Sequence, residues 1–241
     1  MDTRFWGKDG WKISHSIVAR YPLNPTDKDK FIYFLFFFCF QFVLPCIYCR
    51  ASFGEYFKKL PIIKYLESRE SLCEWLYLMH NFVNDKLRKQ GYNHNDDPDL
   101  QSVCKKYDSY VKEINDANCI EMPGFDFIYS VYFNYPLDTP EENLNERKLY
   151  YPVFLDTLIQ ILPFNVAKSV LMKYDVMKRL EEKPETRDNY KQLVYCLEKH
   201  LKDYINCKCI GYTDKCKYIE QYRAGCKGTQ TVGTCRNPDK K

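Results

Sequence analysis

The sequence lacks a strong charge of either sign and any recognisable signal peptide. Its formal net charge is only +4 over 241 residues, which gives no reason to expect a nucleic-acid partner. The first residues, Met1 to Trp11, are polar and contain no apolar region of the kind found in signal peptides. No internal repeat is present. We therefore expect a protein that is not secreted and is not built from repeated units.

Long apolar runs are scarce as well. The longest unbroken run, Phe31–Phe40, has ten residues, whereas a membrane-spanning helix needs about 20. The run leads, past Gln41 and Pro45, into a pair of cysteines, and the reaction of such thiols with other thiols requires water. A buried core helix is therefore favoured over a membrane span, which is the alternative, and no span is expected.

The residues that are present suffice for a large helical core. Hydrophobic residues make up 45% of the chain and aromatic residues 17%, enough for one large domain or two small ones. Proline at positions 22 and 45 ends two helices, and Thr26 with Asp29 forms the pattern of a capping box. Four helices are predicted over residues 7–20, 27–43, 49–60 and 70–89. Four helices with short connections are typical of a helical bundle.

The remainder of the chain divides into a linker, a second helical region and a tail. Residues 90–100 are rich in Asn and Asp and are expected to form a linker. A fifth helix follows, residues 123–140 are aromatic and irregular in pattern, and a helix start with proline at its first position lies at Thr139–Glu142. The later helices are expected over residues 100–118, 149–162, 166–180 and 186–205. We therefore predict an all-α fold with a bundle over 1–95, extending to about 118, a mostly helical domain over 120–205 and a Cys-rich tail over 206–241.

Twelve cysteines are more than a core needs and suggest disulfide chemistry. The most informative pair is the CxxC motif of Cys46 and Cys49, which is typical of a redox dithiol or of half a zinc site. A cysteine at the start of a helix is activated because the helix dipole stabilises its thiolate. The tail spacing, CxC-x6-C-x9-C-x8-C, is not a common zinc pattern. No βαβ pattern of a thioredoxin-type oxidoreductase surrounds the CxxC.

A zinc-bearing scaffold or interaction protein is therefore the main alternative to a redox enzyme. In the redox interpretation no metal ligand is assigned. The two stripes of polar and aromatic side chains that flank the CxxC favour a dithiol that works against a bound planar cofactor.

The first stripe consists of Gly7, Trp11 and His15, which share one helix face because they are spaced four apart. Glycine leaves room for close approach, tryptophan offers a plane for stacking, and histidine offers a hydrogen-bonding group. The alternative interpretation is a core tryptophan with a surface histidine nearby.

The second stripe places His80, Asn81 and Asn84 in the middle of an apolar helix. Such polar groups destabilise the helix unless they meet partners, and the edges of an adenine and a ribose would supply them. A buried hydrogen-bonded network, or a partly exposed face, is the alternative. Lys86 and Lys89, one turn further on, suit a pyrophosphate, although lysines near a helix end are often simply solvated.

These motifs occur in the order Trp6-Gly7-x3-Trp11-x3-His15, Tyr21-Pro22, Pro45-Cys46-x2-Cys49 and His80-Asn81-x-Val83-Asn84-x2-Leu87-x-Lys89. In this combination, about residues 4–95 resemble the Erv/ALR family of FAD-linked sulfhydryl oxidases, in particular the forms carried by large DNA viruses. The resemblance implies a helical bundle that holds FAD beside the CxxC and oxidises protein dithiols to disulfides, with electrons passed to molecular oxygen to give hydrogen peroxide. It also implies a homodimer located in the host cytoplasm or virus factory, or packaged in the virion.

The resemblance further implies roles for individual residues. Cys46 would exchange disulfides with incoming thiols, and Cys49 would lie against the isoalloxazine ring. The residues implied to hold the cofactor are Gly7, Trp11, His15, Tyr56, His80, Asn81, Val83, Asn84, Lys86 and Lys89. The family usually relays electrons through a second cysteine pair, for which Cys207 and Cys209 are the candidates. The alternative is that the tail cysteines form structural bridges or stay unpaired.

The sequence departs from the family pattern in two linked places. The family has a structural disulfide between a cysteine three residues before the His-Asn pair and one at the end of a Phe-Asp-Cys motif. Tyr77 and His94 stand at these positions, so that bridge is absent. The aromatic residue that the family places on FAD has two candidates, Tyr107 and Tyr110. No resemblance extends beyond about residue 120.

Overall fold

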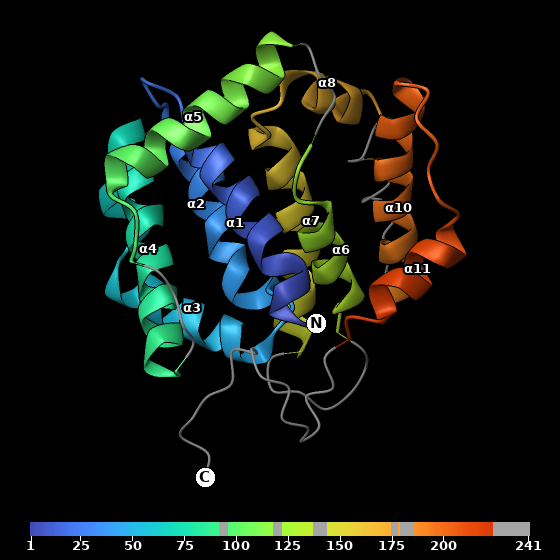
Figure 1. Ribbon diagram of the computed structural model, residues 1–241, viewed down its shortest axis with the longest axis horizontal. Coiled ribbons are helices and arrows are strands. Elements are labelled where there is room, and N and C mark those ends of the chain that lie inside the picture. The colour runs from blue at the N-terminus through green and yellow to red at the C-terminus, as the bar shows by residue number, and fades with distance from the viewer. Residues whose placement is uncertain (92–95, 118–121, 137–143, 175–177, 179–185, 224–241) are drawn as a thin grey trace.

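The computed structural model describes residues 1–91, 96–117, 122–136, 144–174, 178 and 186–223. Within these residues the chain forms helices and no strand, which confirms the predicted all-α class (Figure 1). The helices are α1 (Thr3–Ala19), α2 (Asp27–Val43), α3 (Ile47–Lys59), the short 3₁₀ helix η1 (Ile62–Tyr65), α4 (Arg69–Lys89), α5 (Leu100–Asp116), α6 (Phe125–Phe133), α7 (Leu144–Ile161), α8 (Asn165–Lys173), α10 (Arg187–Tyr204) and α11 (Tyr212–Glu220).

Local signals set the ends of the first helices. The Thr26 side chain accepts from the backbone amide of Asp29 at 3.2 Å and completes a capping box at the start of α2. The helix α1 begins at Thr3 rather than at Gly7, because the carboxylate of Asp2 accepts a hydrogen bond from the Arg4 amide. The helix α3 begins inside the CxxC, two residues earlier than predicted, with Cys46 as its N-cap.

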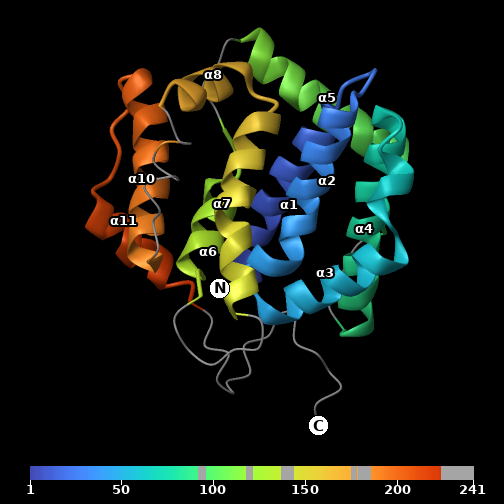
Figure 2. The same ribbon diagram turned by 180° about the vertical axis from the view of Figure 1, so that it is seen from behind.

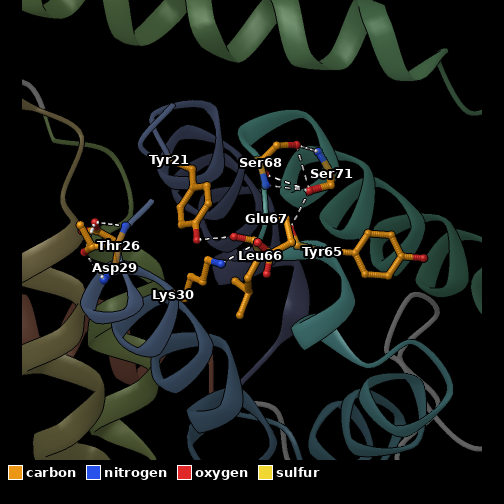
Figure 3. A network of polar contacts seen from close by, with 9 residues as sticks. All are labelled: Tyr21, Thr26, Asp29, Lys30, Tyr65, Leu66, Glu67, Ser68 and Ser71. Carbon is orange, nitrogen blue, oxygen red and sulfur yellow. Dashed lines mark hydrogen bonds and ion pairs between the residues drawn. The ribbon is translucent and has the colours of Figure 1, made fainter. Parts of the chain in front are cut away.

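Polar contacts fasten the turn after α1 to the segment between η1 and α4 (Figure 3). The Tyr21 hydroxyl donates to the Leu66 carbonyl at 2.8 Å, and the Lys30 ammonium lies 2.6 Å from the Glu67 carboxylate. The Ser71 hydroxyl donates to the Tyr65 carbonyl at 2.8 Å. These contacts fix the start of α4 relative to α1 and α2, and α1 and α4 are the helices that carry the two predicted polar stripes.

The helix α2 lies at the centre of the hydrophobic core. Phe36 and Phe37 are fully buried, and their rings face opposite neighbours: Phe37 lies 4.8 Å from Trp75 of α4, and Phe36 lies 5.6 Å from Phe154 of α7. The apolar run over residues 31–40 therefore forms a core helix, as predicted. None of the helices that the structure describes combines the length and apolar character needed to cross a membrane.

The second helical region packs directly on the first. The helix α6 lies along α1, and α7 lies along α2 (Figures 1 and 2). Phe127 of α6 contacts Phe40 with ring centroids 5.8 Å apart, and Tyr150 of α7 stacks on Phe42 at 3.9 Å. Buried residues of both regions form one hydrophobic cluster. The proposed division of the chain into domains stays a prediction about which parts fold alone.

The prediction of an irregular segment over residues 123–140 is wrong for its centre, which forms α6. Its consecutive residues from Phe127 to Phe133 are all buried, so the segment has no polar face and no helical period in its sequence. The helix starts after Gly124, whose φ of 104° favours glycine. A Cβ atom there would also lie 3.0 Å from the side chain of Ile13.

Two other helix boundaries, and the role of the tail, differ from prediction. The helix expected over 149–162 is longer, since α7 starts at Leu144 and accommodates Pro152 in its interior. The helix expected over 166–180 ends at Lys173. The tail contributes to the core after all, because α11 buries Ile219 completely. The predicted helix start at residues 139–142 lies outside the described residues, as do His94 and the tail beyond residue 223.

Candidate cofactor and dithiol site

A cavity of about 430 Å³ lies where α1, α3 and α4 meet, a size within the range of small-molecule sites. Most of its wall is apolar, with Phe53, Leu76 and Met79 among the lining residues. The predicted site residues that line it are Gly7, Trp11, Cys49, Tyr56, Val83 and Lys86. The structure therefore brings together residues from three helices that the sequence pattern selected separately.

Gly7 opens the α1 side of this cavity. A Cβ atom built at Gly7 would meet no other atom within 4 Å, so the α1 backbone borders open space at this position. Trp11, one turn further along the same face, presents its indole to the cavity. Gly7 and Trp11 therefore border the same cavity, and their roles toward a ligand stay a prediction.

A column of stacked rings stands beside the cavity. The Trp11 ring lies flat against His80, with centroids 3.8 Å apart and an interplanar angle of 8°. His15 Nε2 is 3.1 Å from His80 Nδ1, a hydrogen bond in which one ring nitrogen donates to the other. The opposite partner of His15 is Tyr107 of α5, stacked at 4.8 Å. The two predicted stripes therefore meet in one cluster.

Tyr107 is thus the aromatic residue of α5 that reaches this cluster. Tyr110, the other candidate, instead lies under the Lys12 ammonium at 4.2 Å and edge-on to Phe164. The sequence alone could not decide between Tyr107 and Tyr110, because the answer depends on how α5 crosses α1.

Both histidines of the cluster are neutral at physiological pH. Burial, and then the nearby His80, lower the pKa of His15 to about 3. Burial lowers the pKa of His80 to about 4, against a small opposing effect of Asp97. Each neutral imidazole has one N–H donor and one acceptor nitrogen, so the pair can hydrogen-bond without a buried charge.

Polar side chains continue along α4 towards its C-terminal end. The Asn84 amide donates to Asp97 at 2.6 Å, and Arg88 forms an ion pair with the same carboxylate at 2.8 Å. The Lys86 ammonium donates to the Ser52 hydroxyl of α3 at 2.6 Å. Asn84 is therefore engaged by the segment that precedes α5 and does not line the cavity. Sequence analysis missed Asp97 because it assigned this segment to a linker.

Besides His80 and Asn84, two further predicted site residues of α4, Asn81 and Lys89, do not line the cavity. Asn81 is half-buried, and Lys89 is exposed near the end of the helix. The structure does not place the Lys89 side chain among the lining residues.

The CxxC lies at the junction of cavity and surface. Cys49 lines the cavity, and its backbone N–H donates to the Cys46 sulfur at 3.4 Å. Hydrogen bonds to that sulfur, first from the Cys49 thiol and then from the backbone N–H groups of Cys49 and Tyr48, outweigh burial and lower the pKa of Cys46 to about 6. A helix N-cap position is where the helix dipole also favours a thiolate.

Trp6, Arg4 and Ser52 are among the lining residues that were not predicted as site residues. Trp6 is nearly buried, and its indole N–H has no hydrogen-bond partner in the part of the chain that the structure describes. Ser52 follows Cys49 by three residues and thus lies on the same face of α3, a spacing that the sequence does show. No sequence signal singled out Arg4.

Comparison with known proteins agrees with this geometry. The model of the Erv1 / Alr family matches residues 8–107. Residues 8–107 are therefore similar to the Erv1/Alr family. The match includes Trp11, His15, the CxxC, the second polar stripe and Tyr107.

Several relatives of the Erv1/Alr region are named as FAD-linked sulfhydryl oxidases. A probable FAD-linked sulfhydryl oxidase R368 of Acanthamoeba polyphaga mimivirus is 41% identical over 85 residues, which are 35% of this chain and 59% of that protein. The mitochondrial FAD-linked sulfhydryl oxidase ERV1 of Saccharomyces cerevisiae is 36% identical over 39% of this chain and 49% of its own length. The FAD-linked sulfhydryl oxidase of an African swine fever virus isolate from Kenya is 29% identical over 35% of this chain and 70% of its own length. The chain thus spans about half to three fifths of the first two relatives.

The sequence also left open a zinc site and a shuttle pair in the tail. Across the described ranges, no three His, Cys, Asp or Glu side chains gather closely enough to hold a metal ion. Cys207 is exposed and Cys209 half-buried, between α10 and α11. These helices stand at the edge of the molecule opposite α4 (Figures 1 and 2). The structure therefore does not bring Cys207 and Cys209 to the cavity.

Proposed function

We propose that this chain is an FAD-dependent sulfhydryl oxidase, which forms disulfides in protein dithiols and passes the electrons to molecular oxygen. One observation carries the proposal: Cys49 of the CxxC lies on the wall of a cavity that Trp11 and Tyr56 also line. A dithiol that exchanges with substrates must also deliver electrons inward, and this placement gives it an inner and an outer sulfur. The names of the relatives point to the same activity.

The cavity fits FAD in its shape and chemistry. Trp11 and Tyr56 offer aromatic planes against which a flat ring system can stack. The buried indole N–H of Trp6 has no partner among the described residues, and a ligand acceptor would satisfy it. Lys86 and Arg4 place two cations on the wall, as a pyrophosphate requires. We assign the ring side to Gly7, Trp11, Cys49, Tyr56 and Val83.

The remaining predicted residues support that wall. His15 and His80 are hydrogen-bonded to each other, and His80 stacks beneath Trp11. Asn84 is held by Asp97. We propose that they position Trp11 and the end of α4, with Asn81 and Lys89 contributing to the outer, polar part of the cofactor site.

Thiol exchange at Cys46 begins the reaction. A substrate thiolate attacks the Cys46 sulfur of the Cys46–Cys49 disulfide, and Cys49 leaves as a thiolate on the cavity wall. The second substrate thiolate then attacks the substrate sulfur of the mixed disulfide and expels Cys46. A leaving thiol of low pKa leaves faster, and the pKa of Cys46 is lowered to about 6. The substrate has then lost two electrons and the CxxC has gained them.

When bound, FAD supplies the electron acceptor that reoxidises the CxxC and passes the pair to oxygen, giving hydrogen peroxide. The residues of this chain hold Cys49 against the cavity and keep its surroundings apolar. Phe53 and Met79 line the same cavity, and an apolar wall limits the access of water to the reacting sulfur.

The partners and location of the protein are part of the same proposal. We propose protein dithiols as substrates and a homodimer as the assembly. We place the protein in the host cytoplasm or virus factory, or in the virion, because several relatives are viral proteins. Light scattering of the purified chain tests the dimer, and immunogold labelling of infected cells tests the location.

The activity is tested by adding FAD to the purified chain and following oxygen consumption with a reduced model protein and with a small dithiol. We expect a yellow protein that consumes oxygen, and a Cys46→Ser variant that stays yellow but consumes none. A Cys196→Ser variant, which changes a cysteine on α10, is the matched control and should behave as the unchanged chain. A chain that binds no FAD, or a Cys46→Ser variant of full activity, would overturn the proposal.

A further inference from the structure

Two cysteines outside the CxxC contact each other across a helix pair. Cys73 lies on α4 and Cys104 on α5, and their thiol groups are within hydrogen-bonding contact. The first half of α5 crosses the start of α4 (Figure 1). Cys73 is 7% exposed, and Cys104 packs half-buried against the same hydrophobic core.

The two cysteines lie close, along their helices, to residues of the aromatic cluster at the candidate site. Cys73 lies about two helical turns before His80 on α4, and Cys104 lies one turn before Tyr107 on α5. Tyr107 stacks on His15, which in turn contacts His80. A link between the two cysteines would therefore hold α5, and with it Tyr107, against the ring cluster.

We propose that Cys73 and Cys104 form a disulfide that fastens α5 to α4. Tyr77 lies one turn after Cys73 on the same helix. At the position of Tyr77, the Erv/ALR family carries one cysteine of its structural disulfide. The proposed bond would thus join α4 to the chain that follows it, through a different pair of residues. It closes a long loop, and closure of long loops restricts the unfolded chain most.

The reaction requires an external oxidant, for which a low-molecular-weight disulfide suffices. One thiolate attacks that disulfide, forms a mixed disulfide and releases one small thiol. The second protein thiolate then attacks the protein sulfur of the mixed disulfide and releases the other small thiol. Two protons and two electrons leave the pair, and the small disulfide is reduced to two thiols. This step depends on the contact between Cys73 and Cys104 and not on the proposed oxidase activity.

Burial sets the kinetics of this pair. It raises the pKa of the Cys73 thiol, where the adjacent Cys104 adds to the effect, and it also raises the pKa of Cys104. Since the thiolate is the reacting species, bond formation should be slow in the folded protein and faster while the chain folds. Once formed, the bond should resist reductants for the same lack of access.

The test uses the full chain refolded in a mixture of oxidised and reduced glutathione. Remaining thiols are alkylated with N-ethylmaleimide in denaturant at low pH, and unreduced peptides are analysed by mass spectrometry. We expect a linked peptide pair containing Cys73 and Cys104. Cys39, buried in α2, is the internal control and should carry the maleimide. Maleimide on both Cys73 and Cys104, or either one linked to another cysteine, would overturn the proposal.

Stability provides a second readout that does not depend on flavin or turnover. Reduction of the oxidised chain should shift its urea midpoint to lower concentration, and by more than reduction shifts the midpoint of a Cys104→Ala variant, which lacks the proposed bond. Cys104 is only half-buried, so this variant should fold even if Cys73→Ala does not. Equal shifts on reduction in the unchanged chain and in Cys104→Ala would show that the bond contributes nothing. A Cys49→Ser variant should still form the bond, which separates this result from the oxidase proposal.

Discussion

In the second helical region a buried carboxylate is surrounded by partners, whereas in the first region a buried indole N–H lies beside a cavity. Glu198 of α10 accepts from the Tyr129 hydroxyl at 2.7 Å and pairs with Lys215 and Lys202, each at 2.9 Å. Trp6, in contrast, has a buried N–H without a partner among the described residues, and it lines the cavity.

The difference separates polar groups that stabilise a fold from those that await a ligand. A closed network around Glu198 satisfies its own hydrogen bonds and needs nothing further. Polar groups beside a cavity leave hydrogen-bonding capacity that a bound molecule can use. Burial of polar side chains alone therefore does not mark a functional site, and the presence of adjoining space is what distinguishes the two.

The largest expected effect is on the CxxC. Cys49→Ser should abolish oxygen consumption with any thiol while FAD stays bound, because no thiolate remains on the cavity wall. Cys46→Ser should also abolish turnover, yet leave Cys49 free to give a long-wavelength charge-transfer band with oxidised FAD. Visible spectra of the two variants check this assignment. Appearance of the band in Cys49→Ser and its absence in Cys46→Ser would reverse the roles.

In the second region we expect a loss of stability without a loss of chemistry. Glu198→Ala leaves Lys215 buried without its carboxylate, and breaking a buried ion pair in this way costs about 3–5 kcal/mol. Urea denaturation measures the loss. The control is Glu146→Ala, an exposed glutamate of α7, which should change the free energy of unfolding little. If folded Glu198→Ala protein lost its FAD, the second region would have a direct part in the site.

In the first region, removal of a buried polar side chain should lower both the affinity for FAD and the thermal stability. His80→Ala removes the partner of both Trp11 and His15 and should weaken FAD binding. Ligand binding adds about 2.7 kcal/mol to folding at a concentration about 100 times Kd, so the stabilisation by added FAD should shrink. Thermal melting with and without FAD measures this. His200→Ala on α10 is the matched control, and an unchanged FAD response in His80→Ala would place the cofactor elsewhere.

The sequence predicted the elements whose signals are local. The capping box of Thr26 and Asp29 predicts the start of α2, and Pro45 its end, because each acts on the adjacent backbone. The helix α6 was missed because a helix buried on every side shows no alternation of apolar and polar residues. Its burial depends on α1 and α10, which are distant in sequence.

The same distinction applies to the candidate site. The spacing along α1 and α4 predicted which residues share a face, and resemblance to the family joined the two faces. The choice between Tyr107 and Tyr110, and the contact of Asp97 with Asn84, depend on how α5 and its preceding segment cross the bundle. The free space beside Trp6 depends on packing among five helices, which no local pattern records.

A pH titration sharpens the assignment of the two sulfurs. In the reduced protein Cys46 should react with iodoacetamide at half its maximal rate near pH 6, because its pKa is lowered to about 6. Cys49→Ala removes the strongest cause of that shift, so the midpoint should rise. If Cys46 reacted with the same pH midpoint in the reduced wild-type protein and in Cys49→Ala, Cys49 would not be the hydrogen-bond donor to the Cys46 sulfur.

The same shift affects stability. The folded pKa of Cys46 lies below its ordinary value of 9.0, so the unfolded chain binds more protons between these values. This thiol therefore stabilises the reduced protein fully above pH 9, and its contribution is lost as the pH falls towards 6. Urea denaturation of the reduced chain and of Cys46→Ala across this range should show the difference.

The smallest effect is expected from the tail, where Cys207 and Cys209 form the proposed shuttle. A Cys-Lys-Cys disulfide closes a small, strained ring, and strained disulfides are the more oxidising ones. Since these residues lie between α10 and α11, at the edge opposite α4, transfer to Cys46 would take place between two copies of the chain. Replacing both cysteines by serine should slow oxidation of folded protein substrates, and this slowing should depend on enzyme concentration. A small dithiol, which reaches Cys46 directly, should be oxidised at an unchanged rate. Equal rates on protein substrates for the double variant, the unchanged chain and a Cys196→Ser control would rule the shuttle out and leave Cys207 and Cys209 a structural role.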